Sequence, residues 1–381
     1  IRRGQISIWG EANVGVYKPI WKDDKDAIAM TLVESAVPRP FWRGALRALA
    51  RLVAAAIDVY ALAALAYLAL RLLVGERWWV LGLANSLMPL PLLPALPALI
   101  VLLACWRGRA IRLWHAALLL PAVIAFVVLY GGLFIPRAYA VPDDAPQFTL
   151  LTFNLQSQMG NAEAIADLIL ASDSDIVALQ ELTQTLSDQL MPRLAEMYPY
   201  RAVYATDAFA VGMGVFSRLP ILDETMRELT FYNQRVRIAL DDDSAITLFN
   251  VHPPPPQFQR GFDSTMRGQD IASILDWAAE ETGAVVLAGD WNSTDQSEDY
   301  ARVASRYRDS FREAGWGFGA SWPNFRHTRY PLSAWVAGFM PPLIRIDHIF
   351  HTDAVQALEA APLASSAGSD HFPVRARLAL P

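Results

Sequence analysis

Residues 285–292 read Val-Val-Leu-Ala-Gly-Asp-Trp-Asn. A short apolar run that ends at a glycine predicts a buried β-strand. The acid and the amide, Asp290 and Asn292, then lie at the carboxyl end of that strand. Because open α/β sheets usually present their catalytic groups at this edge, the stretch predicts both a sheet and the position of a site.

Other predicted strands, over residues 148–154, 175–180, 245–252, 345–350 and 374–380, also carry polar residues at or near their ends. Together with Asp290 and Asn292, they form a set of eight candidate site residues: Asn154, Glu181, His252, Asp290, Asn292, Asp347, Asp370 and His371. Each one alone has an ordinary explanation as a cap, a turn residue or a structural histidine. Together they supply oxygen ligands for Mg²⁺ or Mn²⁺, an acid or base, and amide donors. This combination predicts metal-assisted hydrolysis of a phosphate ester.

The rest of the sequence beyond residue 147 alternates between helix and strand patterns. Helices are predicted over 162–170, 183–197 and 265–279, with further strands over 212–217, 235–240 and 284–288. The sequence contains no internal repeat, P-loop or HExxH zinc motif. A single cysteine, Cys105, excludes an internal disulfide. Residues 148–381 are therefore predicted to form one α/β domain.

Six short blocks in this domain resemble, in order and spacing, the signature blocks of the endonuclease/exonuclease/phosphatase superfamily. They are Thr152-Phe153-Asn154, Gln180-Glu181, Asn250-Val251-His252, Gly289-Asp290-Trp291-Asn292, Ile346-Asp347-His348 and Ser369-Asp370-His371. The resemblance extends from Phe148 to the C-terminus. One departure is Trp291, where phenylalanine is common in the superfamily, and this change keeps the aromatic character. The resemblance implies a DNase I-like four-layer α/β/β/α sandwich with a shallow site at one end of the sheets.

The resemblance also implies roles for the metal-side residues. Glu181 is expected to be the principal ligand of Mg²⁺ or Mn²⁺. Asn154 and Asp370 are expected to help hold the metal or the phosphate. Asp290 would orient or deprotonate the attacking water, and Asn292 would hold that water or a phosphoryl oxygen.

The two histidines receive different expected roles from the resemblance. His371, oriented by Asp347, is similar to the histidine that contacts the phosphate or assists proton transfer. This pairing would also explain a carboxylate inside an otherwise apolar strand. His252 is similar to the second histidine, a candidate proton donor to the leaving oxygen and a candidate substrate contact.

The N-terminal part of the chain has a different composition, consistent with 54% hydrophobic and only 18% charged residues overall. Three apolar stretches, Leu52–Val74, Val80–Ala104 and Leu113–Ile135, each approach the ~20 residues needed to cross a bilayer. We therefore expect about three transmembrane helices. Pro89, Pro91, Pro94 and Pro97 are expected to kink or break the second one, which leaves its full crossing open. Asp58 lies inside the first stretch, where a carboxylate suggests a functional role or a partner helix.

Basic residues predict the orientation of these helices. Arg43, Arg47 and Arg51 precede the first stretch, and Arg107, Arg109 and Arg112 separate the second from the third. Both groups are expected on the cytoplasmic side of the inner membrane. Three crossings then place the catalytic domain outside the cytoplasm.

The expected organisation has four parts. Residues 1–40 form a cytoplasmic segment to which we assign no role, and the initial Ile1 suggests an incomplete or processed reading frame. Residues 41–136 form the membrane anchor, and 137–147 a polar linker. Residues 148–381 form the catalytic domain. The linker reaches at most ~40 Å, which keeps the site near the bilayer.

Local features favour a lipid substrate. The net charge of −6 gives no global basic field for nucleic acid. A rigid Pro253-Pro254-Pro255-Pro256 run follows His252, and residues 315–343 are rich in aromatics, which either bind an apolar ligand or fill a small core of their own loop. Together with the anchor, these features resemble bacterial membrane phosphatases of the glycopeptide-resistance type, which act on polyprenyl pyrophosphates. The expected substrate is a lipid-linked phosphate or pyrophosphate, and the bilayer is the expected partner.

Two alternatives remain at this stage, and no protein partner can be inferred. A membrane-tethered nuclease acting on DNA or RNA would need a basic or aromatic groove. Arginines that could supply one are Arg218, Arg235, Arg237, Arg260, Arg267, Arg326 and Arg329. A non-catalytic interaction module is the other alternative, and the complete set of catalytic residue types argues against it.

Overall fold

A computed structural model describes residues 41–105, 113–137, 139, 141–142, 144–156, 161–208, 210–259, 261–328 and 333–381. The predicted cytoplasmic segment 1–40 lies outside these residues. So do Arg107, Arg109, Arg112, Arg260 and Arg329. The predictions made for them are therefore not addressed by the structure.

The first sheet is built around the strand that begins the catalytic domain. It contains β1 (Gln147–Asn154), β2 (Ile176–Gln180), β3 (Tyr200–Tyr204), β4 (Met213–Ser217), β11 (Gln356–Pro362) and β12 (Val374–Ala379), in the order β11-β12-β1-β2-β4-β3. β1 and β2 are parallel, whereas the other neighbours are antiparallel.

The second sheet repeats this plan around its own parallel pair, β7 and β8. It contains β5 (Ile221–Glu228), β6 (Tyr232–Ala239), β7 (Ala245–Val251), β8 (Val285–Asp290), β9 (Arg308–Asp309) and β10 (Asp347–His351), in the order β5-β6-β7-β8-β10-β9. Both sheets are thus mixed, with a parallel pair near the centre.

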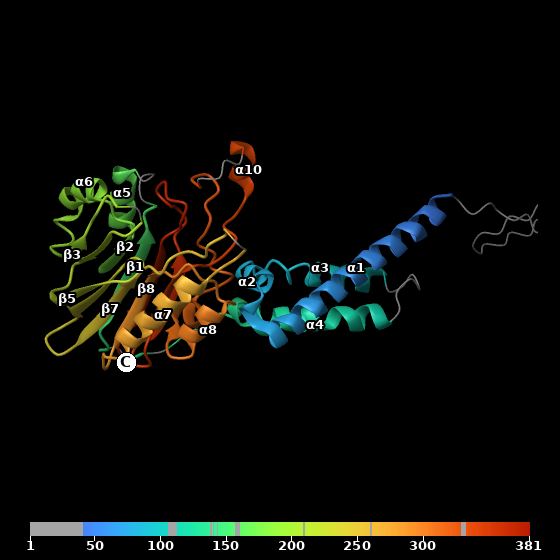
Figure 1. Ribbon diagram of the computed structural model, residues 1–381, viewed down its shortest axis with the longest axis horizontal. Helices are drawn as coiled ribbons and strands as arrows, with labels where there is room; N and C mark the ends of the chain where they lie inside the picture. Colours follow the sequence, from blue (N-terminus) through green and yellow to red (C-terminus); the bar gives the residue numbers. More distant parts are fainter. Residues whose placement is uncertain are drawn as a thin grey trace, which may run out of the picture.

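Helices cover the outer face of each sheet (Figure 1). They are α5 (Ala162–Ala171) and α6 (Gln184–Leu194) on the first sheet, and α7 (Thr265–Ala278) and α8 (Glu298–Ala304) on the second. In β1, Leu151 and Phe153 pack against α5 and α6, while Phe148 and Leu150 face the second sheet. This alternation follows from the two-residue period of a strand. The predicted α/β/β/α sandwich is confirmed.

Sequence analysis missed four strands, β3, β5, β9 and β11. All four are edge strands, and β9 is only two residues long. Residues 221–228 read Ile-Leu-Asp-Glu-Thr-Met-Arg-Glu and are largely exposed. Edge strands carry charge to discourage pairing with other chains, so the apolar alternation that marks a half-buried strand is absent there.

The N-terminal part forms a separate group of helices, which we call the helical region. It contains α1 (Phe41–Val74), α2 (Trp79–Ser86), α3 (Ala95–Cys105) and α4 (Leu113–Tyr130), with short 3-10 turns at Gly75–Arg77 and Gly131–Phe134. Among the described residues, two helices, Gly44–Arg77 and Leu113–Phe134, are long and apolar enough to cross a membrane. Many of their large apolar side chains point outward, including Leu52, Leu62, Leu72, Ile124 and Val128.

The second apolar stretch is not one spanning helix. It consists of α2 and α3, separated by turns over Leu87–Pro94 where three of the four prolines lie. With 11 residues, α3 extends only about 16 Å, well short of a ~30 Å hydrocarbon core. The break arises because proline lacks the N–H that continues a helix.

The carboxylate Asp58 in α1 has a partner on α4. Its Oδ1 atom lies 2.6 Å from Nδ1 of His115, and both side chains are largely buried. Pairing lowers the cost of a charge among apolar helices. The contact also fixes the register of α1 against α4.

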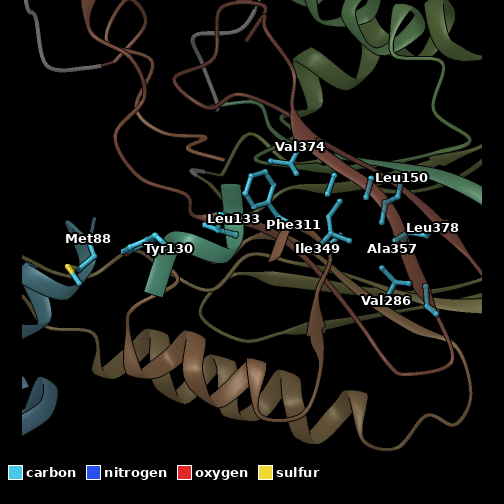
Figure 2. Close-up of a cluster of buried hydrophobic side chains, with 14 of the residues drawn as sticks. Met88, Tyr130, Leu133, Leu150, Val286, Phe311, Ile349, Ala357, Val374 and Leu378 are labelled. Carbon is cyan, nitrogen blue, oxygen red and sulfur yellow. The ribbon is translucent and has the colours of Figure 1, made fainter. Parts of the chain in front are cut away.

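The helical region docks directly onto the sandwich. Figure 2 shows Tyr130 and Leu133 lying between Met88 and core residues such as Phe311, within one connected apolar cluster. Hydrogen bonds reinforce this contact: Arg71 donates to Gln296, Thr294 to Asn85, Arg312 to Leu129, and Gly317 to Leu133. The helical region and the sandwich are therefore held in a fixed relative orientation.

Candidate active site

The candidate site lies at one edge of the two sheets because of the strand directions. In the first sheet, Asn154 pairs with Gln180 at the carboxyl ends of β1 and β2. In the second, β7 and β8 also end together, and Asp290 pairs with Asp347 at the start of antiparallel β10. All eight predicted site residues come at this edge or in the loops that leave it.

A glycine allows β8 to reach this edge beside β7. A Cβ atom at Gly289 would lie 1.9 Å from the carbonyl oxygen of Val251. That separation is impossible, so only glycine permits this close approach. The next residue, Asp290, is thereby placed beside His252, which follows Val251.

Two carboxylates meet at the amide of Asn154. Its Nδ2 atom donates to Oε1 of Glu181 at 3.1 Å and to Oδ2 of Asp290 at 2.9 Å. Its Oδ1 atom accepts from the backbone N–H of Gln156. The side chains at the ends of β1, β2 and β8 are therefore in direct contact.

Three non-glycine residues at the site have left-handed backbone conformations. The φ angles are +50° at Gln156, +56° at Glu181 and +49° at Asn292. Such residues are uncommon, and they tend to gather at functional sites. Here each follows a strand and turns its side chain back toward the sheet edge.

A second line of groups runs from Asp347 through His371 to Asp290. Nδ1 of His371 lies 3.0 Å from Oδ2 of Asp347, and its Nε2 lies 3.7 Å from Oδ2 of Asp290. All three residues are buried. The hydroxyl of Ser321 accepts from the backbone N–H of Asp347, which holds the start of β10 in place.

Burial and charge set the protonation of these groups. Burial opposes the charged form of His371, but Asp347 and Asp290 outweigh it and raise its pKa from 6.5 to about 10. Burial also opposes ionisation of Asp290, yet His371 and His252 lower its pKa to about 2. Burial, with a smaller contribution from Asp290, raises the pKa of Asp347. The Asp347–His371 pair therefore retains a proton at neutral pH, while Asp290 is ionised.

His252 faces the same carboxylates from the other side. Its Nε2 lies 3.6 Å from Asp290 and 4.0 Å from Glu181, and its backbone N–H donates to Asn233. Burial favours the neutral ring, but the two carboxylates prevail and raise the pKa. His252 can therefore carry a proton toward a substrate.

Asn292 closes the loop after β8. Its backbone N–H donates to Oδ1 of Asp290 at 2.9 Å, and its Nδ2 donates to the carbonyl oxygen of Pro253 at 3.0 Å. Arg267 donates to its carbonyl oxygen. The amide thus ties the proline run after His252 to the β8 loop.

Asp370 is held by three groups from two segments. The indole of Trp322 donates to its Oδ2 at 3.2 Å, Asn324 donates to its carbonyl oxygen, and its backbone N–H donates to Oε1 of Gln156. Burial raises the pKa of Asp370 despite the nearby charge of His371. The carboxylate therefore lies at the mouth of the site with one oxygen engaged.

The donor set suits a divalent cation. Carboxylates are hard oxygen ligands of the kind that Mg²⁺ and Mn²⁺ take. Within the described residues, Asp290, Asp347 and His371 place ligand atoms within 4.8 Å of one another. Glu181 and Asp290, which share the amide of Asn154, give a second grouping. We favour the second, because both oxygens of Asp347 already face His371.

Several supporting residues were not predicted. Ser321, Asn233 and Gln156 position Asp347, His252 and Asp370 through single hydrogen bonds. Ser369 donates to the carbonyl oxygen of Asn154 and so joins the last loop to β1. Ser369 belongs to the Ser369-Asp370-His371 block, whereas Ser321, Asn233 and Gln156 carry no local sequence signal, because an isolated Ser, Asn or Gln is common anywhere in a chain.

The sequence model of the Endonuclease/Exonuclease/phosphatase family matches residues 151–371, more than half of the chain. The chain belongs to this family. The match begins within β1 and ends at His371, so it contains every predicted site residue. No curated protein matches the chain.

A solved structure shares the sandwich. An endonuclease/exonuclease/phosphatase from Bacteroides vulgatus is 19% identical, with a TM-score of 0.50, and the alignment covers 62% of this chain and 99% of that one. TDP2 from D. rerio, complexed with single strand DNA product, is 16% identical with a TM-score of 0.49, covering 61% and 98%. At 19% identity, the likeness to the first of these structures concerns the fold alone.

Proposed function

We propose that this protein hydrolyses a lipid-linked phosphate or pyrophosphate at the membrane surface, using Mg²⁺ or Mn²⁺. The observation that carries the proposal is the position of the site, whose bordering loops also contact the helical region. In the loop after β8, the hydroxyl of Thr294 donates to the carbonyl oxygen of Asn85, and the side chain of Gln296 accepts from Arg71. In the loop after β7, Gly261 lies against the ring of Trp79 in α2.

The dimensions of α1 support a membrane location. Between Arg51 and Arg71 the helix carries one charged side chain, the paired Asp58. Those arginines are 20 residues apart, about 30 Å at ~1.5 Å per residue, which equals a hydrocarbon core. Arg71 lies at the catalytic end, where it bonds Gln296. A substrate phosphate in the headgroup layer would therefore be close to the site.

The aromatic side chains of residues 315–343 have different surroundings, and two of them face the interior of the protein. Phe318 packs its ring against Phe126, Tyr130 and Phe134 of the helical region. Trp322 borders the catalytic residues.

Trp335 and Phe339 lie on the short helix α10 (Ala334–Phe339), which projects from the sandwich (Figure 1). Both side chains are more than 70% exposed and pack against each other. Exposed aromatic pairs of this kind suit the membrane interface.

Three of the five candidate arginines that the structure describes do not favour a nuclease. Arg218 pairs with Asp173 at the opposite end of the first sheet, Arg235 pairs with Asp223 and Glu281, and Arg267 is buried against Asp299. These cations are engaged within the protein rather than gathered beside the site. A groove for a nucleic-acid backbone needs such charges free.

The proposed chemistry follows from the protonation states. A carboxylate with a pKa of about 2 is a weak base, so Asp290 is assigned to orient the attacking water by accepting its hydrogen bond. Protonated His371 would donate to a phosphoryl oxygen, and His252 would give its proton to the leaving oxygen. Glu181, Asn154 and Asp370 would hold the divalent cation beside the carboxylate of Asp290, and the cation would supply charge neutralisation when bound.

The test compares substrates with full-length protein in detergent. Phosphate release from polyprenyl pyrophosphate, with Mg²⁺ or Mn²⁺, is measured beside cleavage of phospholipids and DNA. We expect release from the polyprenyl substrate that is lost on chelation. Robust DNA nicking without any lipid hydrolysis would overturn the substrate assignment and favour the nuclease.

The proposed orientation, with the catalytic domain outside the cytoplasm of an inner-membrane protein, has its own test. Protease is added to spheroplasts and to inverted vesicles, and loss of the catalytic domain is followed by blotting. We expect cleavage in spheroplasts alone. Cleavage in inverted vesicles alone would reverse the orientation.

A further inference from the structure

An apolar groove connects the candidate active site with the helical region. It has a volume of about 280 Å³ and is lined by Leu87, Trp322, Pro323, Phe325, Thr328, Leu343 and Ile344. Thr328 contributes the one hydroxyl of this set. Six of the lining residues come from the loops before β10, and Leu87 comes from the turn between α2 and α3.

One wall of the groove belongs to the catalytic site. The indole of Trp322 donates to Asp370 at 3.2 Å, and its ring centroid lies 6.4 Å from that of His371. If the phosphate of a ligand is bound among these residues, the part of the ligand next to the phosphate would extend along the face of the indole. The polar edge of Trp322 would face the phosphate and its apolar face the rest of the molecule.

The opposite end opens toward the surface that is proposed to face lipid. Leu87 is 38% exposed, and Leu90 and Leu93 of the same turn are exposed to a similar degree. The groove is therefore continuous with the apolar surface of the helical region. An apolar chain could pass from the bilayer into the groove without crossing a polar surface.

The walls are fixed rather than adaptable. Trp322 and Ile344 exchange backbone hydrogen bonds of 3.0 and 2.9 Å. The neighbouring Ser321 accepts from the backbone N–H of Ile346 and of Asp347. The groove and the catalytic Asp347–His371 pair thus share one backbone framework, so a chain in the groove would set the position of its own phosphate.

We propose that this groove binds the first part of the substrate's long apolar chain, and so selects long-chain phosphate esters over short soluble ones. This inference rests on the proposed function. The volume lies just below the ~300–1,000 Å³ of whole small-molecule sites, which suits the segment of a chain next to the phosphate. Isoprenoid and alkyl chains share this chemistry.

The kinetic test uses hexadecyl phosphate, farnesyl pyrophosphate and butyl phosphate with full-length protein in mixed micelles. Leu87→Trp fills the groove from the helical side, and Leu343→Asp places a charge in it. We expect the ratio of kcat/KM for hexadecyl over butyl phosphate to fall about tenfold or more in both variants. Farnesyl pyrophosphate distinguishes an isoprenoid preference from an alkyl one.

Leu90→Trp is the matched control, since Leu90 lies on the same turn, is equally exposed, and does not line the groove. Its ratio should stay at the wild-type value. Unchanged ratios in both groove variants, with an active wild type, would overturn the groove while leaving the proposed function intact.

A binding experiment separates the two proposals when turnover fails. A hexadecyl phosphate with a diazirine close to the phosphate is photo-crosslinked, and the labelled peptides are sequenced. Labelling at Leu87, residues 322–328 or residues 343–344, reduced by Leu87→Trp, supports the groove even in an enzyme that releases no phosphate. Labelling elsewhere overturns the groove.

Discussion

Nδ1 of His371 lies 3.0 Å from Oδ2 of Asp347, and both side chains are almost completely buried. The carboxylate comes from the start of β10, and the imidazole from the loop before β12. This pair joins the two sheets of the sandwich at the site, because β10 and β12 belong to different sheets. An orienting carboxylate fixes both the ring position and its proton.

Asp347→Asn tests this orientation. The amide keeps the shape but cannot stabilise the imidazolium, so we expect kcat to fall by about 100-fold or more with a small change in KM. The pH at which His371 loses its proton should also move down, which the pH profile of kcat reports.

The control for Asp347→Asn is Asp353→Asn, since Asp353 follows the same strand and is 91% exposed. It should behave as wild type. A wild-type pH profile in Asp347→Asn would remove the orienting role from Asp347.

Glu181→Gln tests the expected metal ligand. The amide is a weaker ligand than the carboxylate, so we expect the affinity for Mn²⁺ to fall by about 10- to 100-fold, with turnover lower by orders of magnitude. Titration calorimetry measures the affinity, and circular dichroism checks the fold. Glu163→Gln, at the exposed start of α5, is the control. Unaltered Mn²⁺ binding would exclude Glu181 as a ligand.

His252→Gln tests the assignment of the proton donor. A poor leaving group needs a proton, whereas p-nitrophenolate does not. We expect kcat to fall by about 100-fold or more for butyl phosphate and by about fivefold or less for p-nitrophenyl phosphate. Equal losses on both substrates would assign His252 to binding or structure instead.

The stability of the metal-free protein should depend on pH through His371. Its pKa in the folded protein is raised from 6.5 to about 10. The stabilisation is therefore present in full below pH 6.5 and is lost as the pH rises toward about 10. In denaturant unfolding with a chelator present, the free energy of unfolding of His371→Gln should lie below that of wild type at about pH 6. This difference between variant and wild type should be smaller at about pH 10.5. A deficit that does not change with pH would contradict this linkage.

Phe318→Ala tests the docking of the helical region. Its ring contacts Phe126, Tyr130 and Phe134, and it is half-buried, so we expect a loss of about 2 kcal/mol, below the ~3–5 kcal/mol of a fully buried phenylalanine. Thermal unfolding in detergent measures it.

Trp316→Ala is the matched control for docking. Trp316 contacts Phe134 but is 68% exposed, so its loss should be at most about 0.5 kcal/mol. Equal shifts for the two variants would mean that Phe318 does not carry the contact.

The central strands and their polar ends could be predicted from the sequence. Residues 285–288 are apolar, and residues 285–290 are buried throughout, as in a central strand flanked on both faces. The order of the six signature blocks predicted the family, because each block joins a strand to a site residue. Edge strands such as β5 escaped prediction, since their charged and exposed residues lack that apolar signal.

The family blocks already named His252 and His371 as the site histidines, and the tertiary structure shows why His348 is not one of them. His348 lies one residue after Asp347, yet it bonds Arg345 and Ser293, and burial together with Arg345 lowers its pKa to about 4. His252 and His371 are remote in sequence but meet at Asp290.

The sequence alone determined the strands, the set of reactive groups and the apolar stretches, because these depend on local composition and period. The prolines already predicted a kink or break in the second stretch, whereas the tertiary structure decided the docking of the helical region and the groove from Leu87 to Trp322. Each of these depends on contacts between segments far apart along the chain, which no local pattern encodes.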